Sequence, residues 1–128
     1  MRMIRNSNMV KQAIDFKGIE FGKVHPTDID CVLEFDGKHL ILIEVKKAGN
    51  NIPMGQKNVL ERIANYWKGN SIVLKVEHEC DEHGDIPIQQ CLLTLYYYKG
   101  KWHKPKKSKM LPEVIQDLAK MWNITRIM

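Results

Sequence analysis

The hydrophobic and polar positions divide the first half of the chain into two strand-like segments joined by a tight turn. Residues 29–35 and 40–45 are rich in β-branched and other apolar side chains, and Asp36-Gly37 between them is a strong hairpin signature. Residues 40–43 are continuously apolar. Such a run is typical of a strand buried on both faces, which predicts a central position in a sheet covered by helices.

The remaining segments alternate between helical and strand-like periods. In chain order, we expect a short helix at 7–16, a helix at 55–68 ended by Gly69, strands at 71–76 and 91–98, and a last helix opening at Leu111 with Pro112 in its first turn. This order predicts a single domain over residues 1–128, of the α/β or α+β class. Its core would be a central mixed sheet of four to five strands flanked by helices.

Composition narrows the class of protein without naming a function. The chain has 128 residues, of which 44% are hydrophobic and 27% charged, which is ordinary for a globular domain and disfavours disorder or a collagen-like repeat. It contains no apolar stretch long enough for a membrane helix and no recognisable secretory signal. The three cysteines lack a disulfide-framework spacing, so we expect free thiols, a reducing compartment and a cytoplasmic location.

Positive charge is concentrated near the end of the chain. The net charge is +5, and residues 99–128 hold 8 of the 20 basic side chains but only 2 of the 15 acidic ones. Dense lysines beside Trp102 and His103 are suited to a nucleic-acid backbone, and the alternative is a solvated loop. The lysines of this segment are Lys99, Lys101, Lys104, Lys106, Lys107 and Lys109.

A second cluster contains ligand types that suit zinc. His78, Cys80, His83 and Cys91 follow one another, but their spacing is not that of a common zinc site. We therefore favour an exposed polar loop at this position.

The strand at 40–45 ends in an unusual pair of charges. Glu44 and Lys46 follow the apolar run. An unpaired charge buried at that position would lower the free energy of unfolding by roughly several kcal/mol. The period of two places both side chains on one face, about 6.6 Å apart along the strand. Both could therefore reach one small ligand, whereas the alternative is a structural salt bridge from Lys46 to Glu44 or Asp28.

The hairpin supplies a second carboxylate if its loop has three residues. With Asp36-Gly37-Lys38 as the loop, Phe35 faces His39 and the pairing sets Asp30 opposite Glu44. Cross-strand neighbours have Cβ atoms about 4.5–5.5 Å apart, close enough for two carboxylates to share a divalent cation. Two carboxylates and a backbone carbonyl suit Mg²⁺, and an adjacent lysine suits hydrolysis of a phosphodiester.

These residues resemble the motif of a known superfamily. Pro26-Thr27-Asp28-Ile29-Asp30, followed by Ile43-Glu44-Val45-Lys46, is similar to the PD-(D/E)XK nucleases, which have the restriction-endonuclease-like fold. The small phage-type and Holliday-junction-resolvase-like members are the most similar. The resemblance covers about residues 26–68. It implies that Asp30, Glu44 and the Val45 carbonyl hold Mg²⁺, with Asp28 as the alternative first acid, and that Lys46 is catalytic.

A further candidate lies on the helix that follows. Gln56 shares a helical face with Leu60, Ile63 and Trp67, so it points towards the sheet. The resemblance implies a catalytic or DNA-contacting glutamine at this place, and the alternative is a local hydrogen bond.

The resulting expectation is a Mg²⁺-dependent endonuclease, able to use Mn²⁺, that cuts duplex or branched DNA as a homodimer. Residues expected to hold the DNA backbone are Lys47, Lys101, Lys104, Lys106, Lys107 and Lys109. The alternative function is a non-catalytic nucleic-acid-binding module with the same fold.

Overall fold

The computed structural model describes residues 15, 17–22, 26–81 and 84–128. The expected helix at 7–16 lies outside these residues, apart from Asp15. In chain order, the helices and strands are β1 (Cys31–Phe35), β2 (His39–Lys47), α1 (Met54–Tyr66), β3 (Asn70–His78), β4 (Leu92–Tyr98), β5 (Lys101–His103) and α2 (Leu111–Trp122), with 3-10 turns at Ile88–Gln90 and Thr125–Ile127.

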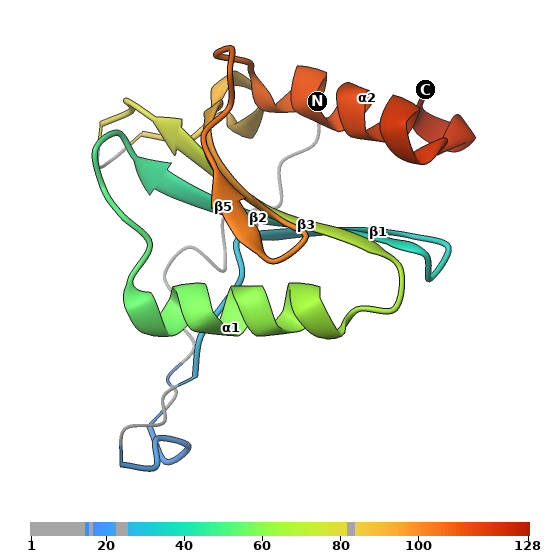
Figure 1. Ribbon diagram of the computed structural model, residues 1–128. Coiled ribbons are helices and arrows are strands. Elements are labelled where there is room, and N and C mark those ends of the chain that lie inside the picture. Colours follow the sequence, from blue (N-terminus) through green and yellow to red (C-terminus); the bar gives the residue numbers. More distant parts are fainter. Residues whose placement is uncertain (1–14, 16, 23–25, 82–83) are drawn as a thin grey trace.

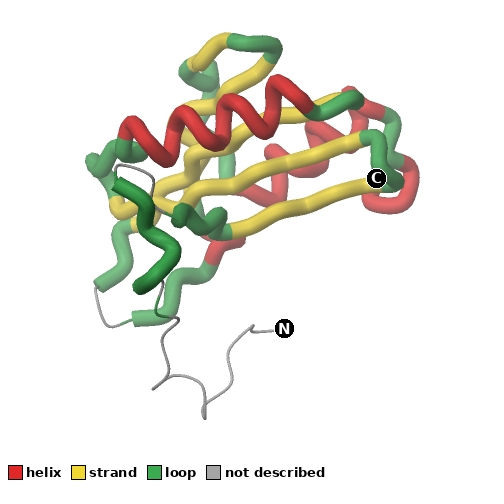
Figure 2. Tube along the Cα trace, turned by 90° about the horizontal axis from the view of Figure 1, so that it is seen from below, coloured by secondary structure: helices red, strands yellow, loops and turns green. Residues whose placement is uncertain are grey.

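The strands form one mixed sheet in the order β1-β2-β3-β4-β5. Strands β2 and β3 are parallel and are connected through α1, whereas the other neighbouring pairs are antiparallel. Helices α1 and α2 cover opposite faces of the sheet (Figure 1), and α1 lies along the strands in the perpendicular view (Figure 2). The expected α+β class and sheet size are confirmed. Among the described residues, no helix is long and apolar enough to cross a membrane.

The β1–β2 hairpin has the three-residue loop that the candidate site requires. Phe35 pairs with His39, and the Lys38 amide donates to the Phe35 carbonyl over 2.9 Å. Asp36 and Gly37 take φ angles of 58° and 68°, the left-handed conformation in which aspartate and glycine are tolerated. The expected register is therefore confirmed.

Alternation along β2 sends its side chains into two separate cores. Leu40 and Leu42 pack in the layer between the sheet and α1, while Ile41 and Ile43 pack in the layer under α2. Because side chains alternate along a strand, Glu44 and Lys46 continue the α1 side. The candidate residues are thus on the sheet face that α1 covers.

The turn between α1 and β3 closes tightly on the hairpin loop. The Asn70 amide donates to the Lys38 carbonyl over 2.9 Å, and a Cβ atom at Gly69 would lie 2.0 Å from that same carbonyl oxygen. Glycine is therefore required at position 69 for backbone contact. Contrary to the sequence prediction, it does not end the helix, because α1 already ends at Tyr66 with Trp67 as its C-cap. The hydrogen bond from Asn70 to Lys38 holds the start of β3 against the residue that precedes β2.

We predict that Gly69→Ala destabilises the protein by about 1–3 kcal/mol, because the added methyl group must displace backbone rather than a flexible side chain. Gly55→Ala is the matched control, since a Cβ atom there meets nothing within 4 Å and alanine favours the helix. Urea unfolding measures both changes. Equal stability of the two variants would contradict the close approach at Gly69.

Candidate metal-dependent active site

Two carboxylates meet at the carboxyl end of β2, on the α1 side of the sheet. Asp30 immediately precedes β1, and its Oδ2 accepts a hydrogen bond of 2.8 Å from the Val45 amide. The Asp30 amide in turn donates to Glu44 Oε1 over 3.3 Å. The hairpin therefore brings Asp30 and Glu44 together, as the three-residue loop predicts.

Gln56, in the first turn of α1, connects the other members of the site. Its Nε2 donates to Glu44 Oε2 over 2.7 Å and to the Asp28 carbonyl over 3.3 Å. Its Oε1 accepts a hydrogen bond of 3.3 Å from Lys46 Nζ. Four sequence-predicted residues, contributed by the hairpin and by α1, are thus linked into one cluster.

Glu44 has the most perturbed carboxyl group of the cluster. Its side chain is 0% exposed, and this burial, together with the negative charge of Asp30, raises its pKa to about 7. The Asp30 amide and the Lys46 ammonium lower the pKa, whereas Asp28 raises it further. A buried carboxylate beside a second carboxylate is therefore the unfavourable arrangement that a bound cation would relieve.

Lys46 is not neutralised by a direct ion pair. The ion pairs of the described residues do not join Lys46 to Asp28, Asp30 or Glu44, and its amine contacts the neutral amide of Gln56 instead. The structural salt bridge considered from the sequence is thus not formed. The half-buried Lys46 ammonium donates to the neutral Gln56 amide and can also contact an anionic ligand.

The residues present fit a divalent cation. The donors are the carboxylate oxygens of Asp30 and Glu44 with the adjacent Val45 carbonyl, an oxygen set suited to Mg²⁺ or Mn²⁺. Asp28 is exposed and contributes its carbonyl to Gln56, so Asp30 has the closer contacts to Glu44. Within the described part of the chain, no three His, Cys, Asp or Glu side chains gather as a metal cluster. The site would thus bind its ion through two carboxylates and neutral oxygens.

A neighbouring charged group was missed from the sequence. Lys75 and Glu77 on β3 form an ion pair of 2.5 Å, and Thr94 Oγ1 donates to Glu77 Oε2 over 2.9 Å. Burial raises the pKa of Glu77, but the hydrogen bonds from Lys75, the Gly49 amide and Thr94 outweigh it, so the pKa is lowered. The available signal was a Lys-x-Glu at the end of the 71–76 strand, which mirrors the Glu-x-Lys of β2.

The parallel register sets these two charged pairs side by side. Glu44 pairs with Lys75, and Lys46 pairs with Glu77, so charges of opposite sign alternate on one sheet face. Lys75 and Glu77 neutralise each other. The net charge of the remaining three side chains, Asp30, Glu44 and Lys46, is then −1 when all are ionised. This balance also favours a cation at the carboxylates.

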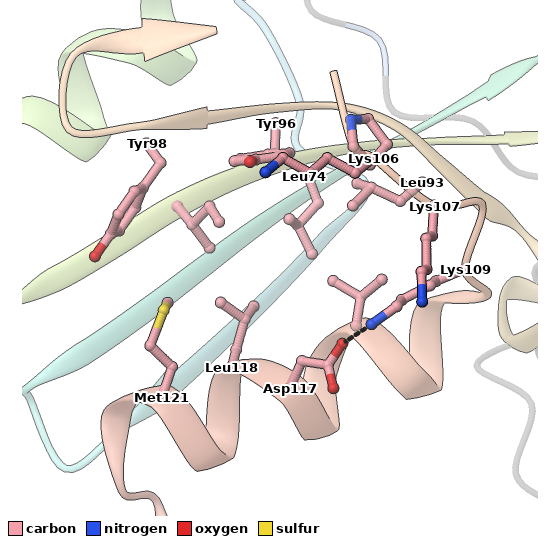
Figure 3. Close-up of a pocket in the computed structure, with 13 residues that line it drawn as sticks. Leu74, Leu93, Tyr96, Tyr98, Lys106, Lys107, Lys109, Asp117, Leu118 and Met121 are labelled. Atoms are coloured by element: carbon pink, nitrogen blue, oxygen red, sulfur yellow. Dashed lines mark hydrogen bonds and ion pairs between the residues drawn. The ribbon is translucent and has the colours of Figure 1, made fainter. Parts of the chain in front are cut away.

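Most of the late lysines lie away from this site. Lys106, Lys107 and Lys109 surround a pocket beside α2, where Lys109 forms an ion pair of 2.6 Å with Asp117 (Figure 3). The pocket floor includes Leu74 and Leu93, which belong to the core layer under α2. The structure therefore does not bring these three lysines next to the carboxylates.

The other predicted lysines lie at the margins of the sheet. Lys47 is exposed at the end of β2, Lys101 is exposed on β5, and Lys104 follows β5 directly. Strand β5 is not among the strands predicted from the sequence, because three residues among lysines carry no clear strand period.

Among the described residues, the candidate zinc ligands do not come together as a metal-binding group. His83 lies outside the described residues, and Cys91 is fully buried in the core beneath α2, where burial raises its pKa. Cys31, Cys80 and Cys91 all carry free thiols, as expected. The buried Cys91 behaves as a core residue.

In comparisons with known proteins, no protein-family model, curated protein or solved structure matches this chain. The resemblance to PD-(D/E)XK nucleases therefore rests on the sequence motif alone.

We predict that Glu44 makes metal binding and stability depend on pH. Its folded pKa of about 7 lies above the ordinary value of 4.5, so the folded state binds the proton more tightly. Its contribution to the stability of the metal-free protein should be complete below pH 4.5 and lost as pH rises to about 7. Magnesium needs the ionised form, so it should raise the melting temperature by several degrees at about pH 8 and much less at about pH 5.5.

Calorimetry of the wild type and of Glu44→Gln, with and without MgCl₂, tests this pH dependence. The variant should lose both the metal-induced shift and the decline in stability between pH 4.5 and 7. A magnesium shift of equal size in the variant would exclude Glu44 as a ligand.

Proposed function

We propose that the protein is a Mg²⁺-dependent endonuclease that hydrolyses phosphodiester bonds in DNA. The observation that carries the proposal is the convergence of Asp30, Glu44, Lys46 and Gln56 at one end of the sheet. A carboxylate pair beside a lysine that has no ion-pair partner among the described residues is suited to binding a cation and a phosphate together. A purely structural cluster would be expected to pair its charges internally.

Each residue of the cluster has a distinct part in this reaction. Asp30, Glu44 and the Val45 carbonyl would hold Mg²⁺, which when bound neutralises phosphate charge and makes a coordinated water more acidic. The Lys46 ammonium would bind a scissile-phosphate oxygen and orient the attacking water. Gln56 fixes both the Glu44 carboxylate and the Lys46 amine through its two amide atoms.

The wider proposal concerns the DNA and the assembly. Lys47 follows Lys46 in the chain, but alternation along β2 turns its side chain to the other face of the sheet. Lys47, Lys101, Lys104, Lys106, Lys107 and Lys109 would therefore attract DNA mainly through their combined positive field. A homodimer would place two such sites on the two strands of a duplex or branched substrate. We place this activity in the cytoplasm. Mn²⁺ could substitute for Mg²⁺ at the site.

We predict that Lys46→Ala reduces Mg²⁺-dependent cleavage of plasmid and branched DNA by at least about 10²- to 10³-fold, the loss expected for one charge-stabilising donor. DNA affinity, measured in Ca²⁺, should change by no more than about threefold, because most of the binding energy comes from other phosphate contacts.

Lys68→Ala is the matched control, since this exposed lysine follows the far end of α1. It should cleave at the wild-type rate. Full activity of Lys46→Ala would refute the nuclease assignment. DNA binding without cleavage by the wild type, across plasmid and branched substrates, would instead favour the non-catalytic binding module.

A further inference from the structure

A second pocket opens on the α1 side of the sheet, between the start of α1 and the strands β3, β4 and β5. Its volume is about 360 Å³, which lies within the range of small-molecule sites. Its lining is apolar and aromatic, with two lysines, and comprises Asn51, Ile52, Met54, Lys57, Lys75, Leu95 and Trp102.

One wall of this pocket is an aromatic ring held in a fixed orientation. Trp102 donates its indole N–H to Glu61 Oε2 over 2.8 Å, and it packs against Tyr97 with the ring centroids 5.3 Å apart. The amine of Lys57 lies 5.0 Å from the centre of the Trp102 ring. The lysine chain is flexible, so its amine can leave the ring for an anion and uncover a stacking surface.

The lining also includes a buried cation. Lys75 is 4% exposed, and among the described residues its ammonium has one hydrogen-bond partner, Glu77. An ammonium has three N–H donors, so Lys75 retains donor capacity at the pocket. The ion pair with Glu77 compensates the charge of Lys75, and its remaining N–H donors are available to a ligand with acceptor atoms.

The pocket directly adjoins the candidate active site. Lys75 is the cross-strand partner of Glu44, and Gln56, which binds Glu44, precedes Lys57 in the chain. Neighbouring strands are about 4.8 Å apart, so the pocket begins one strand away from the carboxylates. A polymer that runs from the carboxylates across β3 would meet this pocket next.

We propose that this pocket binds one unpaired nucleotide of the substrate strand, next to the phosphate at the active site. The base stacks on Trp102 and contacts Met54 and Leu95, while the Lys57 amine contacts a phosphate and Lys75 donates to base or sugar acceptors. A volume of about 360 Å³ admits a single nucleotide, and a base that stacks on Trp102 must have left the base stack of a duplex. The inference rests on the proposed nuclease function and defines its substrate as DNA with an unpaired segment.

The test is a titration of the full chain in EDTA, so that neither metal nor turnover contributes. The tryptophan fluorescence is followed during addition of a short oligothymidylate or of a blunt hairpin duplex. The oligothymidylate should quench the wild type and Trp67→Phe, but not Trp102→Phe, and should bind more tightly than the duplex. Trp102→Leu should weaken binding by about 5- to 140-fold, the equivalent of one stacked base.

Two lysine variants complete the test. Lys57→Met should also weaken oligothymidylate binding, whereas Lys120→Met, an exposed lysine on α2, should bind within about twofold of the wild type. Circular dichroism confirms that each variant is folded, and Trp102→Phe retains a ring if the leucine variant does not fold. Absence of quenching in the wild type, quenching that persists in Trp102→Phe, or equal binding of the duplex would overturn the proposal.

The outcomes separate this inference from the proposed function. Selective binding at Trp102 without Mg²⁺-dependent cleavage of any DNA would support the pocket and refute the nuclease. Cleavage without selective binding at Trp102 would support the nuclease and refute the pocket.

Discussion

The candidate site depends on one constraint, the burial of a carboxylate at the end of an otherwise apolar strand. Glu44 has no solvent exposure, and burial together with Asp30 raises its pKa to about 7. Hydrophobic side chains in the same β2 strand secure that position, because Leu42 and Ile43 fill the cores on both sides of the sheet. The folding energy of β2 therefore holds Glu44 where water cannot stabilise its charge. The Asp30 amide and the Gln56 side chain donate hydrogen bonds to the buried Glu44 carboxylate and partly offset this desolvation.

The connection from β2 through α1 to β3 determines what surrounds Glu44. The parallel register places the Lys75–Glu77 pair beside the Glu44-Val45-Lys46 segment, and the first turn of α1 places Gln56 over it. One sheet face thereby holds two adjacent regions, the carboxylates near β1 and the largely apolar Trp102 pocket towards β5. In the proposed reaction the first region holds the metal and phosphate, and the second selects the neighbouring nucleotide.

The sequence predicted the parts of this arrangement that depend on local patterns. The hairpin register followed from Asp36-Gly37 and the flanking strands, and the helical period of 55–68 directed Gln56 to the sheet. What the sequence could not reveal depends on pairing between distant segments. The parallel pairing of β2 with β3 joins Glu44 to Lys75 across thirty-one positions, so the local Lys-x-Glu pattern could not show that Lys75 lies beside the site. Positive charge grouped Lys106, Lys107 and Lys109 with the site in the sequence analysis. The segment between β5 and α2 instead places them on the α2 side of the sheet.

The central claim is that Asp30 and Glu44 bind a divalent cation beside Lys46. The most direct measurement is the anomalous diffraction of crystals soaked in Mn²⁺. The account predicts one Mn²⁺ peak in contact with both carboxylates and the Val45 carbonyl, with Lys46 Nζ nearby but not coordinated. A cluster that stays free of metal at saturating Mn²⁺, with Lys46 moved into an ion pair with Glu44, would contradict the account.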